Sequence, residues 1–152
     1  MRIPAKADYA LRALVELAAT DGTRPLPADR IAERQSIAGP FLAGILGQLR
    51  LSGLVRSVRG AEGGFLLARP AAEISLADVM RAVDGPLATL SGQYPETLSY
   101  PGPAEGLREV WVAVRANIRA VLEHTTIADV ASGTPSKVVK KIVADEDAWQ
   151  RR

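Results

Sequence analysis

The clearest candidate for a binding residue is Arg59, which stands at the base of a glycine-rich turn. Short apolar runs flank the turn, from Leu54 to Val58 and from Phe65 to Leu67, and three glycines lie between them. Because glycine enters positive-φ conformations without a steric cost, this pattern predicts a β-hairpin. An arginine on a narrow hairpin is well shaped to enter the minor groove of DNA. The alternative is an exposed turn residue that pairs with Glu62.

The charge around this turn is more basic than that of the whole chain. The 152 residues carry 19 Lys or Arg and 17 Asp or Glu, which gives a net charge of +2 at pH 7. Within residues 50–69 the only acid is Glu62, and the basic residues are Arg50, Arg56, Arg59 and Arg69. Such a cluster suits contact with phosphates, although a solvated surface could give the same count.

Three predicted helices precede the hairpin and would position it. Apolar residues recur at helical spacing over 7–19, over 28–34 and from Pro40 to Leu51, and a tight turn separates the last two segments. On the third helix, Phe41 and four leucine or isoleucine residues are expected to face inward and leave small and polar residues exposed. This spacing is typical of a helix-turn-helix, and a hairpin after it is the order of a winged helix.

The second half of the chain is predicted to hold one long helix. A capping-box-like pattern from Ser75 to Asp78 first predicts a helix through Val83, and the proline-rich residues 86–103 predict a long loop. A longer amphipathic helix follows from Pro103 to about Glu123. Its apolar stripe consists of Leu107, Val110, Trp111, Val114, Ile118, Val121 and Leu122. No second core is evident to cover the stripe, so pairing with the same helix of a second subunit is expected, with packing on the first helix as the alternative.

These elements predict a mainly α (α+β) fold, a winged helix-turn-helix with a long dimerisation helix. The capping pattern at Thr126–Asp129 predicts one more short helix, and residues 138–143 could form another. The predicted organisation is a DNA-binding domain at 1–85, a loop at 86–103, a dimerisation helix and short terminal helix at 104–132, and a tail at 133–152.

The residue types exclude several kinds of chemistry. The chain has no cysteine, so disulfides, thiolate nucleophiles and cysteine-held zinc or iron–sulfur clusters are excluded. The only histidine, His124, ends the long helix, where it suits the helix dipole better than a metal, and no metal site is predicted. Catalytic motifs are missing, which argues against an enzyme. No apolar run approaches the ~20 residues of a membrane span, so a cytoplasmic protein is expected.

Several motifs in the first 85 residues resemble the Rrf-type (IscR/NsrR/CymR-like) family of bacterial winged helix-turn-helix transcriptional regulators. The matching residues are Met1-Arg2, Lys6, Tyr9-Ala10-Leu11, Ile31-Ala32-Glu33, Phe41-Leu42, Leu49, Gly53-Leu54-Val55, Ser57–Gly60, Gly63–Ala68, Asp78-Val79 and Ala82–Gly85. The glycine-rich wing in register with the upstream helices is the specific part. The resemblance implies a homodimer that sets one winged helix on each half of a near-palindromic operator, most often as a repressor.

The resemblance also implies roles for single residues. Arg59 would enter the minor groove, and the third helix would enter the major groove. The candidates on that helix are Ala38, Gly39, Pro40, Ala43, Gly44 and Gln48. Phosphate contacts are implied for Arg2, Lys6, Tyr9 and Arg34; the basic cluster adds Arg50, and the wing amides add Gly60, Gly63 and Gly64.

Two departures from the family pattern change what is expected. Some relatives hold an iron–sulfur cluster with three cysteines in the loop before the long helix, and this chain has none. No cofactor is therefore predicted, and the signal is expected to be a small ligand or a regulatory protein partner. Ala43 also stands where some relatives carry a polar base-reading side chain, so their operator sequence does not transfer.

Two further hypotheses concern regulation and the alternative function. A small effector is expected between the loop and the long helix, in a pocket lined by Tyr94, Tyr100, Trp111 and His124. The alternative to a DNA-binding regulator is a winged-helix protein-interaction module that has lost DNA binding.

Overall fold

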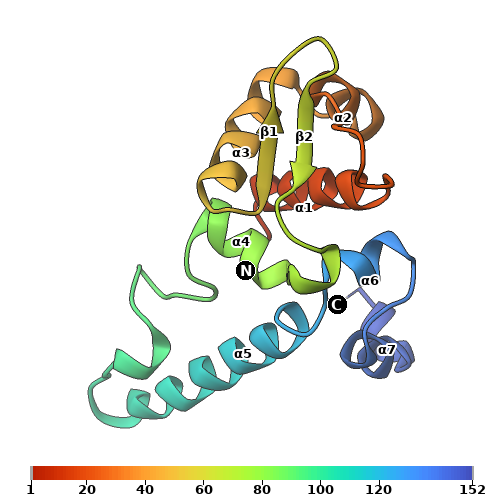
Figure 1. The fold of residues 1–152 in the computed structure, drawn as a ribbon. Helices are drawn as coiled ribbons and strands as arrows, with labels where there is room; N and C mark the ends of the chain where they lie inside the picture. The colour runs from red at the N-terminus through yellow and green to blue at the C-terminus, as the bar shows by residue number, and fades with distance from the viewer. Residues whose placement is uncertain (1, 152) are drawn as a thin grey trace.

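The computed structural model describes residues 2–151, and residues 2–85, called the head below, form the expected winged helix-turn-helix (Figure 1). Its elements are α1 (Ala5–Ala18), α2 (Ala28–Gln35), α3 (Gly39–Leu51), β1 (Val55–Val58), β2 (Gly64–Leu67), a 3₁₀ turn (Ala71–Glu73) and α4 (Leu76–Asp84). All the predicted helices and strands of this half are confirmed, with ends that move by no more than two residues.

The core of the head lies where α1 crosses α3 and α4. Ala7, Ala10 and Ala13 put small side chains on the buried face of α1, which lets neighbouring helices approach closely, and Leu14 is fully buried beside them. From α3 the buried residues are Leu42, Ile45, Leu46 and Leu49, at the three- and four-residue spacing of one helix face. These fully buried side chains account for the stability of the head, because apolar burial is the main favourable term in folding.

The prediction that Phe41 faces inward is wrong. Its side chain is 44% exposed and meets the edge of the Tyr9 ring, with the ring centres 5.6 Å apart. Phe41 therefore packs on the outer surface of the α1–α3 contact, where Tyr9 covers one side of it.

The wing is an antiparallel hairpin whose base is tied to a third segment. Its register pairs Val55 with Leu67 and Val58 with Gly64. Phe65 exchanges two backbone hydrogen bonds with Leu26, at 2.9 and 3.0 Å, so the segment before α2 forms a short bridge beside β2. The wing is thereby held against the rest of the head at its base, and only its tip is free.

Reciprocal capping boxes start two of the helices that the structure describes. Ser75 and Asp78 form a capping box at α4, in which the hydroxyl accepts from the Asp78 N–H and the carboxylate accepts from the Ser75 N–H. Thr126 and Asp129 form the same box at α6 (Ile127–Ala131). Both predicted caps are confirmed.

The second half departs from the prediction mainly before the long helix. Residues 86–103 are not one irregular loop, because 3₁₀ turns occupy Pro95–Thr97 and Gly102–Gly106. The second turn also moves the start of the long helix α5 to Leu107, and it ends at Leu122. A further helix, α7 (Lys137–Val143), and a 3₁₀ turn at Glu146–Trp149 follow α6. No helix within residues 2–151 combines the length and apolar character needed to cross a bilayer.

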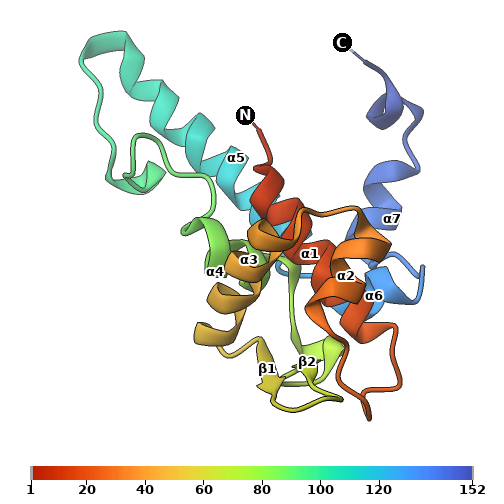
Figure 2. The same ribbon diagram turned by 90° about the horizontal axis from the view of Figure 1, so that it is seen from above.

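The helix α6 packs on the head, whereas α5 leaves it. Ile127 of α6 is fully buried in the core of the head, and its N–H donates to the carbonyl of Ile74 at 2.9 Å. By contrast, α5 contains no buried residue and extends away from the head toward its Leu107 end (Figures 1 and 2). The core of the head is therefore completed by a residue outside the predicted domain 1–85.

Candidate nucleic-acid interface

Arg59 stands exposed where β1 ends, and its side chain is unpaired. No group within residues 2–151 forms an ion pair or a side-chain hydrogen bond with its guanidinium, so the alternative pairing with Glu62 is not formed. Figure 1 shows the tip of the wing at the end of the head farthest from α5. An exposed, unpaired guanidinium at the tip of a narrow hairpin is free to bind an anionic partner.

The three wing glycines have structural reasons to be glycine. Gly60 has a φ of 112°, which side chains other than glycine rarely adopt. A Cβ on Gly63 would lie 2.4 Å from the carbonyl oxygen of Val58, and one on Gly64 would lie 2.5 Å from the backbone of Leu26. These close approaches explain Gly63 and Gly64 without a ligand, and their contact with phosphates stays a prediction.

The start of α3 presents an exposed surface made of small residues. The exposed positions are Ala38, Gly39, Pro40, Ala43 and Gly44. A Cβ added to Gly39 or Gly44 would meet nothing within 4 Å, so packing inside this chain does not require glycine at either position. Since glycine inside a helix is unfavourable by roughly 1 kcal/mol relative to alanine, Gly44 weakens α3 without a packing gain within the chain.

Gln48 differs from the other candidates on α3. Its side chain is half-buried, and its Oε1 is buried without a hydrogen-bond partner in the described part of the chain. An amide oxygen in that position is turned away from solvent, so Gln48 contacts a base only after its side chain rotates outward.

The cations of the head divide into free and paired groups. Arg50, Arg56 and Arg59 are exposed and make no ion pair within residues 2–151, and half-buried Lys6 makes none either. Arg56 was not among the predicted contacts, although it belongs to the basic cluster and lies on the exposed side of β1.

The remaining predicted phosphate contacts already have partners within the chain or lie elsewhere. Arg34 pairs with Glu16 at 3.3 Å, and the half-buried Tyr9 packs on Phe41 with the guanidinium of Arg12 above its ring. Arg2 lines a cavity beside α4 and α5, and so the structure does not bring it to the wing.

The comparisons with known proteins agree with this architecture. The sequence profile of the Rrf2 family, described as an iron-dependent transcriptional regulator, matches residues 3–133. The chain belongs to the Rrf2 family. It is 48% identical over 150 residues to Rv1287 of Mycobacterium tuberculosis, named as an HTH-type transcriptional regulator, covering 99% of this chain and 93% of that protein. It is 34% identical to the HTH-type regulator CymR of Bacillus subtilis over 88% of this chain and 92% of CymR.

Solved structures of Rrf2 regulators share the fold. The structure of CymR, the global cysteine regulator of B. subtilis, has a TM-score of 0.76 and covers 88% of this chain and 98% of its own. The structure of T. potens IscR, 30% identical, has a TM-score of 0.70 over 100% of this chain and 94% of its own. The resemblance identified from the sequence is confirmed, and the chain is a transcriptional regulator rather than an enzyme.

The iron named in the Rrf2 family description does not fit the donor set of this chain. The sequence contains no cysteine and one histidine. Within residues 2–151, no three His, Asp or Glu side chains lie close enough together to hold a metal ion. The side chains of residues 2–151 therefore form no site that fits iron.

The four residues predicted to line an effector pocket do not come together. Trp111 lies near the start of α5 and His124 just beyond its end, about 20 Å apart at the rise of an α-helix. His124 is exposed, and its Nδ1 lies 3.0 Å from the carbonyl oxygen of Ala120, as suits a residue at a helix end. The backbone N–H of Tyr100 donates a hydrogen bond to the carboxylate of Glu105. Tyr94 lines a small cavity between the end of α4 and α5, and the other three residues do not line that cavity. The aromatic character of these residues was therefore not evidence that their side chains lie close together in the fold.

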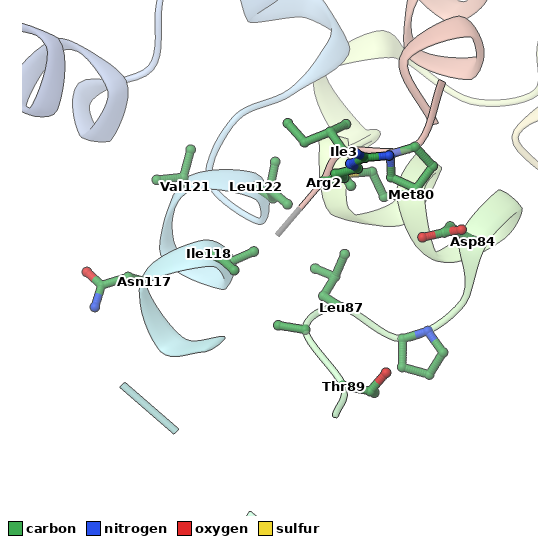
Figure 3. Close-up of a pocket in the computed structure, with 13 residues that line it drawn as sticks. Arg2, Ile3, Met80, Asp84, Leu87, Thr89, Asn117, Ile118, Val121 and Leu122 are labelled. Carbon is green, nitrogen blue, oxygen red and sulfur yellow. The ribbon is translucent and has the colours of Figure 1, made fainter. Parts of the chain in front are cut away.

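A larger cavity, of about 620 Å³, lies instead between the head and α5. Figure 3 shows Ile118 and Leu122 of α5 on one side, Leu87 opposite them, and Met80 of α4 with Ile3 above. Three residues of the predicted dimerisation stripe, Ile118, Val121 and Leu122, line this cavity. The stripe is therefore only partly covered by its own chain.

Proposed function

We propose that the chain is a sequence-specific DNA-binding repressor that acts as a homodimer on a near-palindromic operator. The observation that carries this proposal is the exposed, unpaired Arg59 at the tip of the wing, at the end of the head opposite α5 (Figure 1). Arg59 would enter the minor groove, the start of α3 the major groove, and Arg50, Arg56 and Lys6 would contact phosphates. Such a regulator works in the cytoplasm, where bacterial DNA lies.

The proposed dimer rests on the apolar stripe of α5. Val110 is 51% exposed and Leu107 is 42% exposed, and no residue of α5 is buried. A helix this apolar on one face is stable in water when another surface covers that face. A second copy of α5 supplies such a surface and sets two winged helices at a fixed separation, as a palindromic operator requires.

The proposed regulator works without an iron–sulfur cluster. Its 152 residues offer no thiolate to hold one. The signal is then a small ligand or a protein partner that changes how the two heads are set on α5.

The test is fluorescence anisotropy of the purified protein with DNA from immediately upstream of its own gene. A scrambled duplex and a salt titration run beside it. Tight binding to the upstream DNA alone, weakening with salt, is the expected result, because phosphate contacts release counterions. Arg59→Ala should weaken this binding by roughly 1–3 kcal/mol, as for a typical specific contact.

The matched control is Arg108→Ala, which removes the same charge from the far end of α5 and should leave DNA affinity unchanged. If Arg59→Ala and Arg108→Ala bind the upstream DNA equally well, the role given to the wing is wrong. If no duplex is bound at any salt concentration, the winged-helix protein-interaction module becomes the better description.

A further inference from the structure

A second, smaller cavity of about 280 Å³ lies where the end of α4, the chain after it and α5 meet. Three of the residues that line it are arginines: Arg81 from α4, and Arg115 and Arg119 from α5. Tyr94 and Leu87 supply an aromatic and an aliphatic wall. Three guanidinium groups around one small cavity are unusual, because like charges repel unless anions lie between them.

Two carboxylates of the chain neutralise part of this charge. Glu123 pairs with both Arg81 and Arg119, so one carboxylate links the head to α5. Glu96, from the 3₁₀ turn Pro95–Thr97, accepts from Nη1 of Arg115 through both oxygens, at 2.8 and 2.6 Å. These partners lower the pKa of both carboxyl groups below their ordinary value. One positive charge remains uncompensated among the five groups.

Among the three arginines, Arg115 has a buried hydrogen-bond donor that lacks a partner within residues 2–151. Its side chain is only 19% exposed, and its Nε is buried without a hydrogen-bond partner within residues 2–151. Its guanidinium also lies over the Tyr94 ring, with Cζ 4.8 Å from the ring centre, as in a cation–π contact. A buried donor without a partner is unfavourable, and an anion that reached Arg115 would satisfy it.

We infer that this cavity is an effector site for a small organic anion, a carboxylate or phosphate attached to a flat or apolar group. The anionic group would take the place of Glu96 on Arg115, and the remainder would lie against Tyr94 and Leu87. This inference deepens the proposed function, because it names a class of signal for the regulator. Glu96 then acts as an internal anion that holds the site closed until a ligand competes with it.

Displacement of Glu96 has a structural consequence. The Glu96–Arg115 ion pair holds the Pro95–Thr97 turn against the middle of α5. A ligand that replaces Glu96 removes this ion pair between the turn and the helix while Pro95 of the turn stays buried, and so alters the surface around the apolar stripe that the second subunit would cover. The same ligand lies next to Arg81, which belongs to the head. The site can therefore change the orientation of the head relative to α5.

Isothermal titration calorimetry of the full chain without DNA tests the site. The probes are phenyl phosphate and benzoate, with benzyl alcohol as the neutral counterpart. We expect saturable binding of at least one anion and none of the alcohol. Glu96→Gln should tighten binding about tenfold, because the loss of one charged competitor is of that size. A protein that merely folded badly would not bind more tightly.

Arg115→Gln should abolish binding, and Arg108→Gln is the matched control on the same helix, since Arg108 lies outside the cavity. Circular dichroism checks that both variants keep their helices. Equal affinities of wild type and Glu96→Gln would overturn the inference, and so would binding that survives Arg115→Gln. Both anions could also bind weakly and with the same affinity to every variant. That result would show only a general attraction to positive charge, and it would also overturn the inference.

The anisotropy assay with DNA is then repeated with the tighter anion present. A changed affinity for the operator is the expected result, and an unchanged one removes the regulatory role. Because binding of the anion is measured without DNA, a failure of the proposed DNA binding leaves the calorimetric result intact.

Discussion

The head and α5 contain similar amino acids but differ in how far their apolar side chains are buried. The head encloses its large apolar side chains, and Leu14, Ile31, Leu42 and Ile45 are almost wholly buried, whereas α5 buries none. The charges near the wing differ from those on α5. Arg50, Arg56 and Arg59 are unpaired within residues 2–151, although other arginines of the head are paired. The three arginines of α5, Arg108, Arg115 and Arg119, all form ion pairs.

This difference indicates which contacts each region still needs. A surface with unpaired cations and a satisfied core is suited to a polyanion. A helix with paired charges and an uncovered apolar face is suited to another protein surface. The two halves of the molecule should therefore respond differently to substitution.

The largest effect is expected from a charge on the stripe of α5. Val110→Asp should dissociate the proposed dimer, since an unpaired charge in a buried interface costs roughly 3–5 kcal/mol. Analytical ultracentrifugation measures the change in mass. Val112→Asp is the control, because Val112 is also exposed but lies on the other side of the helix. Identical masses for the two variants would contradict the assignment of the stripe.

A core substitution in the head comes next. Leu14→Ala should lower the free energy of unfolding by about 2–5 kcal/mol, because it removes a fully buried side chain from the contact of α1 with its neighbours. Urea denaturation followed by circular dichroism measures it. Leu51→Ala, at a leucine that is 83% exposed, should change stability by less than about 0.5 kcal/mol. Similar losses at both leucines would show that the core of the head is misplaced.

A substitution that removes the N-terminal cap of α4 should lower the free energy of unfolding by a smaller amount. Ser75→Ala removes the acceptor for the Asp78 N–H and should cost about 1 kcal/mol of stability. The same urea titration detects it. Ser52→Ala serves as the comparison, since Ser52 is exposed at the end of α3 and its hydroxyl makes no hydrogen bond within residues 2–151. An unchanged midpoint for Ser75→Ala would mean that the capping box adds nothing.

Gly44→Ala should separate stability from binding within the head. Alanine has room at this position and favours the helix, so the free energy of unfolding should rise by up to about 1 kcal/mol. DNA affinity should fall, because the added methyl group lies on the surface that would approach the major groove. Gly106→Ala, next to α5, also has room and should not alter DNA binding. Undiminished affinity in Gly44→Ala would remove this position from the interface.

The smallest expected effect is the loss of the ion pair between Glu96 and Arg115 of α5 at low pH. Hydrogen bonds from Arg115 lower the pKa of Glu96 below its ordinary value of 4.5. The ion pair therefore contributes fully above about pH 4.5, and this contribution is lost as the pH falls through the lowered pKa. NMR signals of the Tyr94 ring should shift in that window, and in Glu96→Gln they should stay constant. A Tyr94 shift that persists in Glu96→Gln would assign the change to another group.

The features that could be predicted from the sequence are those with a local signal. The wing follows from glycines next to Arg59, and the caps of α4 and α6 follow from Ser75 and Thr126. The position of Phe41 could not be predicted, because periodicity alone does not reveal that Tyr9 on another helix offers it an outer surface. The arginine-lined cavity left no local signal either, since Arg81 and Arg115 are brought together by the packing of α4 near α5.

The burial of Ile127 in the head sets an order for folding during synthesis. The helix α1 leaves the ribosome before α6, against which it packs, and so its contacts with α6 form only when the chain beyond Ile127 is free. Contacts between segments so distant in sequence are slow to form, because the intervening chain must first be brought together. The whole of α5 is therefore already synthesised when the core of the head closes. A winged head that is ready for DNA always carries with it the helix through which two copies would meet.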